Sequence, residues 1–315
     1  MYLLISQLLL PVSLLIWLVF FPASGWLALC LQIITVAASL FGLSLVGLWV
    51  TPPYWFRILY WCLLAVIIGS HIVRGRLQSD GAWLASPLES GFLFMVALLG
   101  LVGLYLGGLG LMGRQAPEVE TVDIAPPFLT GRYLVAHGGS NSTVNIHLRT
   151  LDPELEQFAR WRGQSRALDL FRIDSVGLHM HGWFPSDPTQ YVTYGTSVVA
   201  PCAGRIALVH DGVADNRVPQ MNREELPGNF VAIECNGNYL ILAHLLAGSM
   251  EVRFGQQVAV GDVIGKIGNS GNSSEPHLHI HAQRGLPVEA PLSGEPLAIT
   301  ISGRFLVRND RIEVP

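Results

Sequence analysis

The charged residues of this chain lie almost entirely in its C-terminal part. The sequence of 315 residues has 19 basic and 23 acidic side chains, but residues 1–112 contain only Arg57, Arg74, Arg76, Asp80 and Glu89. A stretch this poor in charge is typical of a segment in lipid, whereas the composition after residue 112 is typical of a domain in water. We therefore expect a lipid-embedded N-terminal region followed by a water-soluble domain.

Apolar runs in the N-terminal region have the length that crosses a bilayer, about 20 residues each. They predict a four-helix transmembrane region at residues 1–112, with the lipid bilayer as a partner, and lie at Leu3–Phe21, Trp26–Val50, Tyr54–Val73 and Gly91–Met112. The first run has no basic residues before it, which favours a retained helix over a cleaved signal peptide. The runs contain no acidic residue, so we expect an anchor rather than a proton relay.

The positive-inside rule gives a weak prediction of topology. Arg74 and Arg76 lie between the third and fourth runs, and they favour a cytoplasmic loop there, with both termini outside the membrane. Arg57 and Arg114 oppose this orientation. The formal net charge of −4 gives no indication of a nucleic-acid partner.

Residues 113–130 are polar and contain prolines, so they predict a linker before a domain at residues 131–315. Short β-rich runs separated by glycine, asparagine and aspartate fill that domain and predict a mainly-β, antiparallel sandwich or barrel-like fold. These runs are Ser197–Ala200, Ile206–His210, Phe230–Glu234, Tyr239–Ala243, Met250–Arg253, Val263–Ile267, His277–Ala282 and Ile299–Val307. One helix is expected at Asp152–Arg162.

Three histidines alternate with apolar residues near the C-terminus. On a strand, His277, His279 and His281 all point to one face, because side chains two apart share a face. Imidazoles gathered in this way are natural ligands for zinc, although a solvent-facing polar strand would give the same pattern.

The sequence around these histidines resembles the lysostaphin-type (LytM-like) zinc metallopeptidases, which cleave peptide cross-links in bacterial peptidoglycan. The resemblance lies in the segment GQQVAVGDVIGKIGNSGNSSEPHLHIHAQ (255–283), which ends in the family's P-H-L-H motif. Two further segments, GTSVVAPCAGRI (195–206) and GNYLILAHL (237–245), resemble the family's upstream strands. The resemblance implies a duplicated hybrid motif as the fold, and peptidoglycan peptide as the substrate. Together with the apolar runs and the loop of Arg74 and Arg76, this substrate predicts a multi-pass protein of the bacterial cytoplasmic membrane with its C-terminal domain outside.

The resemblance also implies roles for individual residues. His279 and Asp169 correspond to metal ligands, and His277 and His244 to catalytic histidines. The family's remaining ligand is a histidine four residues before the aspartate, where this chain has Ser165. Serine is a poor zinc ligand, and catalytic zinc sites normally have three protein ligands.

Another histidine is therefore needed if Zn²⁺ binds. We favour His147, which ends a strand-like run upstream of Asp169 and could lie beside it on a neighbouring strand. The alternatives are His179 and His181, in an insertion that could cover the cleft. His210 is interpreted as structural, and His137 and His71 carry no functional signal.

The sequence leaves two questions open. Cys202 and Cys235 could form a disulfide outside the cytoplasm, or they could be buried free thiols. The chain could be a membrane-anchored zinc metallo-endopeptidase, or an inactive LytM-like domain that binds the cell wall or regulates another hydrolase. A membrane sensor or transporter component whose soluble domain binds a small ligand is a third hypothesis, which the lack of charge in the apolar runs disfavours.

Overall fold

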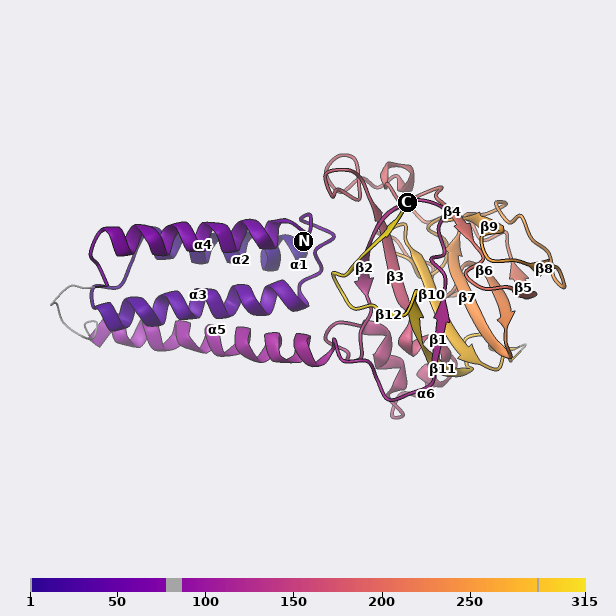
Figure 1. Ribbon diagram of the computed structural model, residues 1–315, viewed down its shortest axis with the longest axis horizontal. Helices are drawn as coiled ribbons and strands as arrows, with labels where there is room; N and C mark the ends of the chain where they lie inside the picture. Colours follow the sequence, from indigo (N-terminus) through magenta and orange to yellow (C-terminus); the bar gives the residue numbers. More distant parts are fainter. Residues whose placement is uncertain (1, 78–86, 288) are drawn as a thin grey trace. The chain divides into compact units, whose positions relative to one another are not determined.

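The computed structural model describes residues 2–77, 87–287 and 289–315. The chain divides into two compact units, Met1–Met112 and Gly113–Pro315. Figure 1 shows that the first unit is helical and that the second contains the strands.

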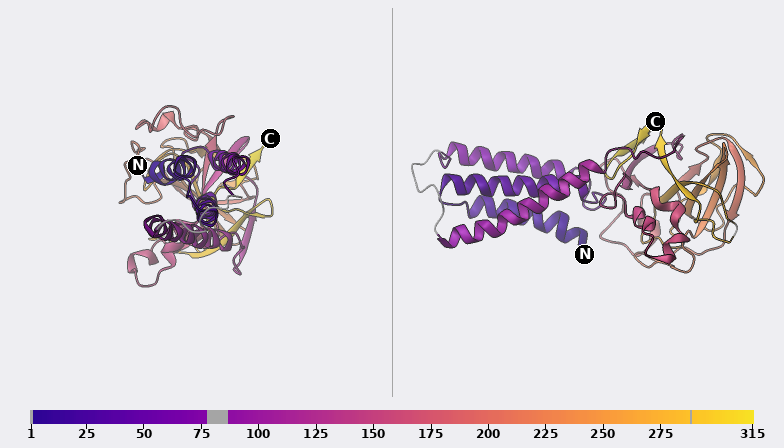
Figure 2. Two further views of the ribbon diagram at one scale, coloured as in Figure 1. Left: turned by 90° about the vertical axis from the view of Figure 1, so that its left-hand side faces the viewer. Right: turned by 90° about the horizontal axis from the view of Figure 1, so that it is seen from below.

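The first unit is built from helices that run alongside one another (Figure 2). They are α1 (Tyr2–Leu4), a π-helical turn (Ile5–Leu9), α2 (Leu10–Phe20), α3 (Trp26–Val46), α4 (Phe56–Val73) and α5 (Pro87–Met112). Helices α3 and α5 approach each other so closely at Gly103 that a side chain there would collide with the backbone of Ala38 and Ser39. The small residue at this position therefore has a packing role.

Among the described residues, three helices are long and apolar enough to cross a membrane, namely Trp26–Val46, Phe56–Val73 and Ser90–Met112. The first predicted run forms a shorter apolar helix, Ile5–Phe20. At 1.5 Å per residue it spans about 24 Å, which is less than the roughly 30 Å of a bilayer core. Four spans therefore stay a prediction. Most of the loop behind the topology argument, residues 78–86, lies outside the described residues.

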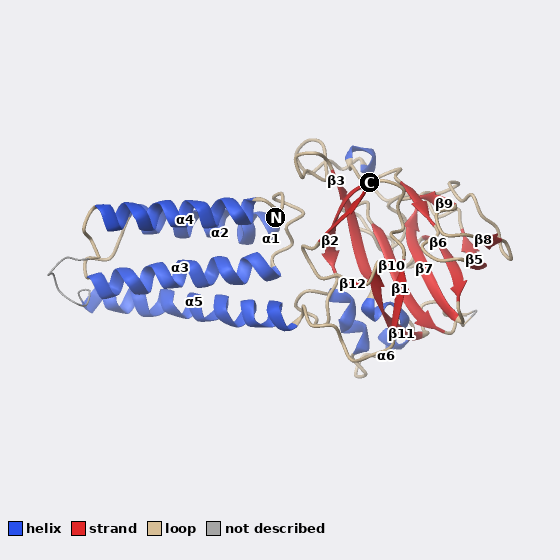
Figure 3. Cartoon of the chain, in the orientation of Figure 1, coloured by secondary structure: helices blue, strands red, loops and turns tan. Residues whose placement is uncertain are grey.

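The second unit is mainly antiparallel β-sheet, which confirms the predicted class (Figure 3). Short helical segments lie at Ile146–Leu151 (3₁₀), α6 (Glu156–Ala159), Arg162–Arg166 (3₁₀) and Pro188–Gln190 (3₁₀). The strands are β1 (Thr121–Ile124), β2 (Gly131–His137), β3 (Leu168–Ile173), β4 (Ser197–Val199), β5 (Gly204–His210), β6 (Asn229–Cys235), β7 (Asn238–Leu245), β8 (Gln257–Val258), β9 (Val263–Lys266), β10 (Leu278–Arg284), β11 (Glu295–Ile301), β12 (Arg304–Phe305) and β13 (Arg311–Val314).

The large sheet has the strand order β13-β2-β3-β10-β7-β6-β5-β8. Strand β11 pairs with β10, β12 and, in parallel, β1, while β4 and β9 form a separate pair. Strand β1 and the buried side chain of Phe128 both lie within the segment expected to be a linker. The fold of the domain therefore begins before residue 131. The expected strand at Met250–Arg253 is wrong, since these residues form none.

The two faces of the large sheet have different roles. Leu278, Ile280 and Ala282 of β10 point into the main core, together with Leu168 and other aliphatic side chains. The alternate residues of β10, which include His279 and His281, are buried on the opposite face. The strand period thus puts the histidines on one face, as the sequence predicts.

Candidate active site

The register of β3 and β10 brings an acid and a histidine together. His279 pairs directly with Asp169 on β3 and with Ala243 on β7. Side chains directly opposite each other on neighbouring strands point to the same face, about 4.5–5.5 Å apart at Cβ. His279 Nδ1 consequently lies 3.0 Å from Asp169 Oδ1.

His147 reaches the same carboxylate from a helical turn. Asn145 caps the 3₁₀ segment Ile146–Leu151, since its side chain accepts a hydrogen bond from the backbone N–H of His147. The amide of Asn145 also donates to the carbonyl of Ala167, 3.0 Å away, which ties this turn to the start of β3. His147 Nε2 lies 2.9 Å from Asp169 Oδ2. The expectation that His147 lies on a strand is wrong, because the chain turns at Asn145.

The side chains of His147, Asp169 and His279 could hold a metal ion, since one donor atom from each lies within 4.8 Å of the others. All three are buried or half-buried. Two imidazole nitrogens and one carboxylate are donors that Zn²⁺ takes in catalytic sites, where a fourth position stays open. The donor set therefore fits zinc.

The ionisation of these groups suits a metal. Burial acts to raise the pKa of Asp169, but the charges and hydrogen bonds of His147 and His277 outweigh it and hold the pKa well below its usual range. Burial lowers the pKa of His279 to about 4, although the hydrogen bond to Asp169 opposes it. A carboxylate and a neutral imidazole are the forms in which these groups bind metals.

Two more histidines border this group, and each is held through Nδ1. His277 Nδ1 donates to the carbonyl of Glu275, 2.8 Å away, and its ring stacks on Phe171. His244 Nδ1 donates to the carbonyl of Ser270, 2.9 Å away. A carbonyl only accepts, so in each neutral ring the lone pair is on Nε2. His277 Nε2 lies 3.5 Å from Asp169 Oδ1.

The environments of these two histidines push their pKa values apart. Burial first, and then the neighbouring His277 and His279, lower the pKa of His244 well below its ordinary value. Burial also acts to lower the pKa of His277, but Asp169 and then Glu275 raise it above the ordinary value. Two titratable groups whose pKa values are pushed apart in this way can serve as a base and an acid.

The backbone of His244 is in the left-handed region, with φ of 62°. Residues other than glycine pay about 1–3 kcal/mol for such conformations, which cluster at functional sites. The backbone hydrogen bonds of His244 hold it there, since its N–H donates to Pro227 and its carbonyl accepts from Gly268. In this conformation the imidazole of His244 lies beside that of His277, with ring centres 5.0 Å apart.

The structure separates the other candidates from the metal group. Ser165 is fully buried, and its hydroxyl bonds to the carbonyl of Arg162 and to Thr150. His179 Nε2 lies 3.2 Å from the carboxylate of Glu275, whose carbonyl holds His277. His181 is exposed. None of these three belongs to the group that could hold a metal in the described chain.

Sequence reasoning missed several residues that position the site. His137 lies opposite Asp169 on β2, but its Nδ1 faces Arg308 Nη2 at 3.0 Å. Glu275 and Ser270 hold His277 and His244 through their carbonyls, and no residue type could have indicated this. Asn145 had a detectable signal, because asparagine before a helical turn is a preferred cap.

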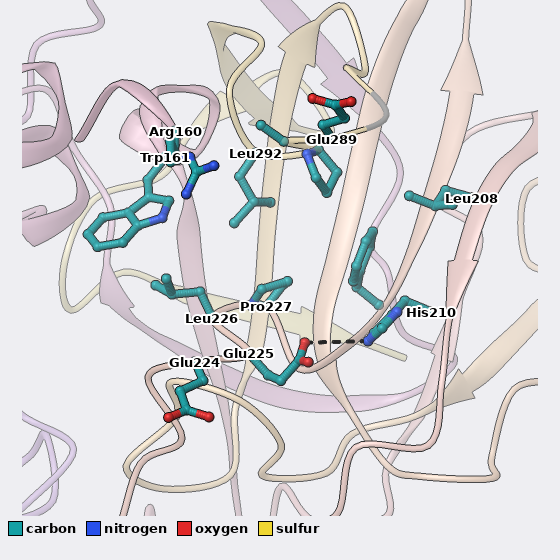
Figure 4. A pocket seen from close by; sticks show the side chains of 13 residues that line it. Arg160, Trp161, Leu208, His210, Glu224, Glu225, Leu226, Pro227, Glu289 and Leu292 are labelled. Atoms are coloured by element: carbon teal, nitrogen blue, oxygen red, sulfur yellow. Dashed lines mark ion pairs between the residues drawn. The ribbon is translucent and has the colours of Figure 1, made fainter. Parts of the chain in front are cut away.

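A cavity of about 420 Å³ is drawn in Figure 4. It lies on the histidine face of the large sheet, because Phe230 of its wall packs in one cluster with Ala243, which pairs with His279. Its apolar walls include Trp161, Phe230 and Leu292. Figure 4 shows the charged groups around it, with Arg160 and Glu289 on one side and Glu224 on the other. His210, interpreted as structural from the sequence, also lines it and pairs with Glu225 at 3.6 Å.

The structure answers the open question about the cysteines of this domain. Cys202 and Cys235 form a disulfide, with Cα atoms 6.3 Å apart. Cys235 ends β6 and packs in the main core, and Cys202 lies against that core.

Known proteins resemble the second half of this chain. Residues 190–291 match the model of peptidase family M23. Peptidoglycan DD-endopeptidase ShyA of Vibrio cholerae is 32% identical over 108 residues, which is 34% of this chain and 24% of ShyA. The chain thus spans about a quarter of the length of this curated relative. His244, His277 and His279 lie inside the family match, whereas His147 and Asp169 precede it.

Solved structures show a weaker likeness. The catalytic domain of lysostaphin from Staphylococcus simulans is 20% identical, with a TM-score of 0.26 over 39% of this chain and 71% of that domain. A chain of the SpoIIQ–SpoIIIAH pore-forming complex is 14% identical, with a TM-score of 0.30 over 55% of this chain and 92% of that one. The sequence match is the stronger finding: residues 190–291 match the model of peptidase family M23, which confirms the lysostaphin-type resemblance.

Proposed function

We propose that this chain is a membrane-anchored zinc metallo-endopeptidase that cleaves the cross-link peptides of peptidoglycan. The observation that carries the proposal is that His147, Asp169 and His279 lie close enough together to hold one metal ion. They do so although this chain has Ser165 at the position where the family has a ligand histidine. Three protein donors restore the number that a catalytic zinc site needs.

The remaining residues supply the acid and base chemistry. Bound zinc would supply Lewis acidity, which polarises a peptide carbonyl and makes water more acidic. His277 Nε2 lies 3.5 Å from Asp169 Oδ1, at the edge of the metal group. From this position it can take a proton from the attacking water and later give it to the leaving amine. His244 is kept neutral by burial, and its Nδ1–H is bound to the carbonyl of Ser270, so its free Nε2 can accept a proton released during the reaction.

The cavity in Figure 4 is a candidate place for the peptide. Ala243 on β7 pairs with His279 on β10. A bulge in β6 places Phe230 beside Ala243, and Phe230 pairs with His210 on β5. Strands lie about 4.8 Å apart, so the cavity begins about 10–14 Å from His279, or roughly three to four extended residues. Trp161→Ala should therefore raise KM for a cross-linked peptide and leave kcat near the wild-type value. An unchanged KM would place the peptide elsewhere.

The location proposed for the domain is outside the cytoplasmic membrane. A disulfide between Cys202 and Cys235 supports it, because such bonds persist in oxidising compartments. The apolar helices of the first unit are compatible with anchoring in the cytoplasmic membrane.

The decisive experiment uses the full chain purified in detergent. Zinc is measured by elemental analysis, and the protein is then incubated with purified peptidoglycan while released peptides are identified by mass spectrometry. We expect about one zinc per chain and loss of cross-linked peptides, abolished by a chelator and by Asp169→Asn. A chain that binds peptidoglycan but retains no zinc and cleaves nothing would show instead an inactive domain that binds the cell wall.

A further inference from the structure

The side-chain amide of Gln283 has a fixed orientation. Gln283 is fully buried on β10, and its Nε2 donates to the carbonyls of Gly285 and Pro291, at 2.7 and 2.8 Å. Carbonyls only accept, so the amide nitrogen must lie on that side and Oε1 on the other. Gly163 makes room for Oε1, because a side chain at Gly163 would collide with it.

His281 stands between this amide and a proposed zinc ligand. Its Nδ1 lies 3.0 Å from His279 Nε2, and the residue is fully buried. In the described chain His281 Nε2 and Gln283 Oε1 are both buried without a hydrogen-bond partner. Residues 281 and 283 share one face of β10. A buried polar atom without a partner is costly, so a proton on His281 Nε2, aimed at Gln283 Oε1, is the arrangement that serves both atoms.

The position of that proton determines the tautomer of the neighbouring imidazole, His279. With its proton on Nε2, a neutral His281 has its lone pair on Nδ1 and accepts from His279 Nε2. His279 must then carry a proton on Nε2, which leaves Nδ1 as the nitrogen that can bind a metal. This is the nitrogen 3.0 Å from Asp169 Oδ1. An unprotonated nitrogen facing a carboxylate oxygen repels it, and a cation between them removes the repulsion.

We propose that His281 and Gln283 form a hydrogen-bond relay that fixes the tautomer of His279 and directs its Nδ1 to the metal. His281 is thus a positioning residue that lies outside the P-H-L-H motif, and this inference rests on the proposed zinc site. The partners of metal-bound histidines commonly change metal affinity about 10–100-fold when they are removed.

Two variants of the full chain in detergent test the relay. His281→Leu has similar bulk but cannot accept from His279, whereas His281→Asn keeps an acceptor oxygen near the position of Nδ1. We expect His281→Leu to weaken zinc binding about 10–100-fold in competition with a chromophoric chelator. His281→Asn should stay within a few-fold of wild type. The visible absorption of the Co²⁺ form should change for His281→Leu and stay close to wild type for His281→Asn.

The outcomes separate positioning from simple packing. Wild-type zinc affinity in His281→Leu overturns the relay. Equal losses of affinity in both variants, together with equal losses of thermal stability, also overturn it, because they indicate a structural role alone.

A second measurement does not need zinc. In the metal-free wild-type chain, ¹⁵N chemical shifts of labelled histidines report which ring nitrogen is protonated, and His281→Leu assigns the signals of His281. We expect a protonated Nε2 on His281, set by the oxygen of Gln283, and an unprotonated Nε2 would refute the relay. If the wild-type chain binds no zinc, the proposed function fails, and this measurement still decides the relay.

Discussion

The assignment that departs most from the family pattern is His147 as a zinc ligand, and replacing it is the most informative perturbation. His147→Ala removes the imidazole whose Nε2 lies 2.9 Å from Asp169 Oδ2 and leaves Asp169 and His279 as the ligands from the chain. We expect zinc binding to weaken strongly while the sheet that holds Asp169 and His279 stays intact, because His147 lies on a short 3₁₀ segment outside it.

The magnitude follows from the number of ligands. Zinc bound by four ligands is stabilised by about 10–16 kcal/mol, or about 2.5–4 kcal/mol for each ligand. Since about 1.4 kcal/mol corresponds to a tenfold change, loss of one ligand predicts a loss of about 10²–10³ in affinity. The side chain of His147 is 16% exposed, so water can enter the space and partly replace the imidazole. We therefore expect the lower end, about 10².

The assay is competition with a chromophoric chelator on the full chain in detergent, and His181→Ala is the matched control. His181 is an exposed histidine and was an alternative ligand, and its substitution should leave the affinity unchanged. His147→Gln keeps an amide that can donate to Asp169 but binds zinc poorly. It should fold like the wild type and still lose zinc, which distinguishes ligand loss from unfolding.

Wild-type affinity in His147→Ala would refute the assignment. Loss of zinc in His181→Ala, with His147→Ala unaffected, would show that the insertion supplies the ligand and that the observed site changes when the metal binds.

The other expected outcomes concern catalysis, the degenerate position, the disulfide and the topology. His277→Ala and His244→Ala should retain zinc by elemental analysis but lose at least about 10²-fold in peptidoglycan cleavage, the usual scale for a lost acid or base; full activity in both would remove their assignment as catalytic residues. Ser165→His should not rescue His147→Ala and should lower the free energy of unfolding by about 1–3 kcal/mol, because Ser165 is fully buried and a larger side chain overpacks its site; recovered zinc binding would contradict this. Cys202→Ala combined with Cys235→Ala should cost about 3–4 kcal/mol in denaturant unfolding, as expected for a loop of 33 residues, and an unchanged midpoint would show that the bond does not stabilise the domain. A phosphatase fused after Pro315 should be active outside the cytoplasm, and a silent phosphatase beside an active cytoplasmic reporter at the same position would reverse the topology.

Local patterns in the sequence determined a large part of this protein. The near absence of charge before residue 113 predicted apolar helices, and three of the four runs have the length and composition of membrane spans. The alternation in His277–Ala282 placed the histidines on one face of a strand, because side-chain direction depends on the neighbouring residues alone. The segment 255–283 indicated the family, and the family match confirms it.

The tertiary structure decided what depends on residues far apart in the chain. Asp169 and His279 are 110 positions apart, and only the register of β3 against β10 makes them neighbours. The sequence ranked His147 first among the replacements, but on an expected strand. The chain brings it to Asp169 through a capped turn tied to Ala167 instead.

The cysteines show the same division. Residue types and compartment could not decide whether Cys202 and Cys235 form a disulfide. The structure answers the question, because it joins the two residues with their Cα atoms 6.3 Å apart. Sequence periodicity fixes which way a side chain points on its own element, since backbone geometry repeats every few residues. Which side chains meet is fixed by strand pairing and turns, whose energies come from contacts between distant segments, and these contacts leave no local pattern.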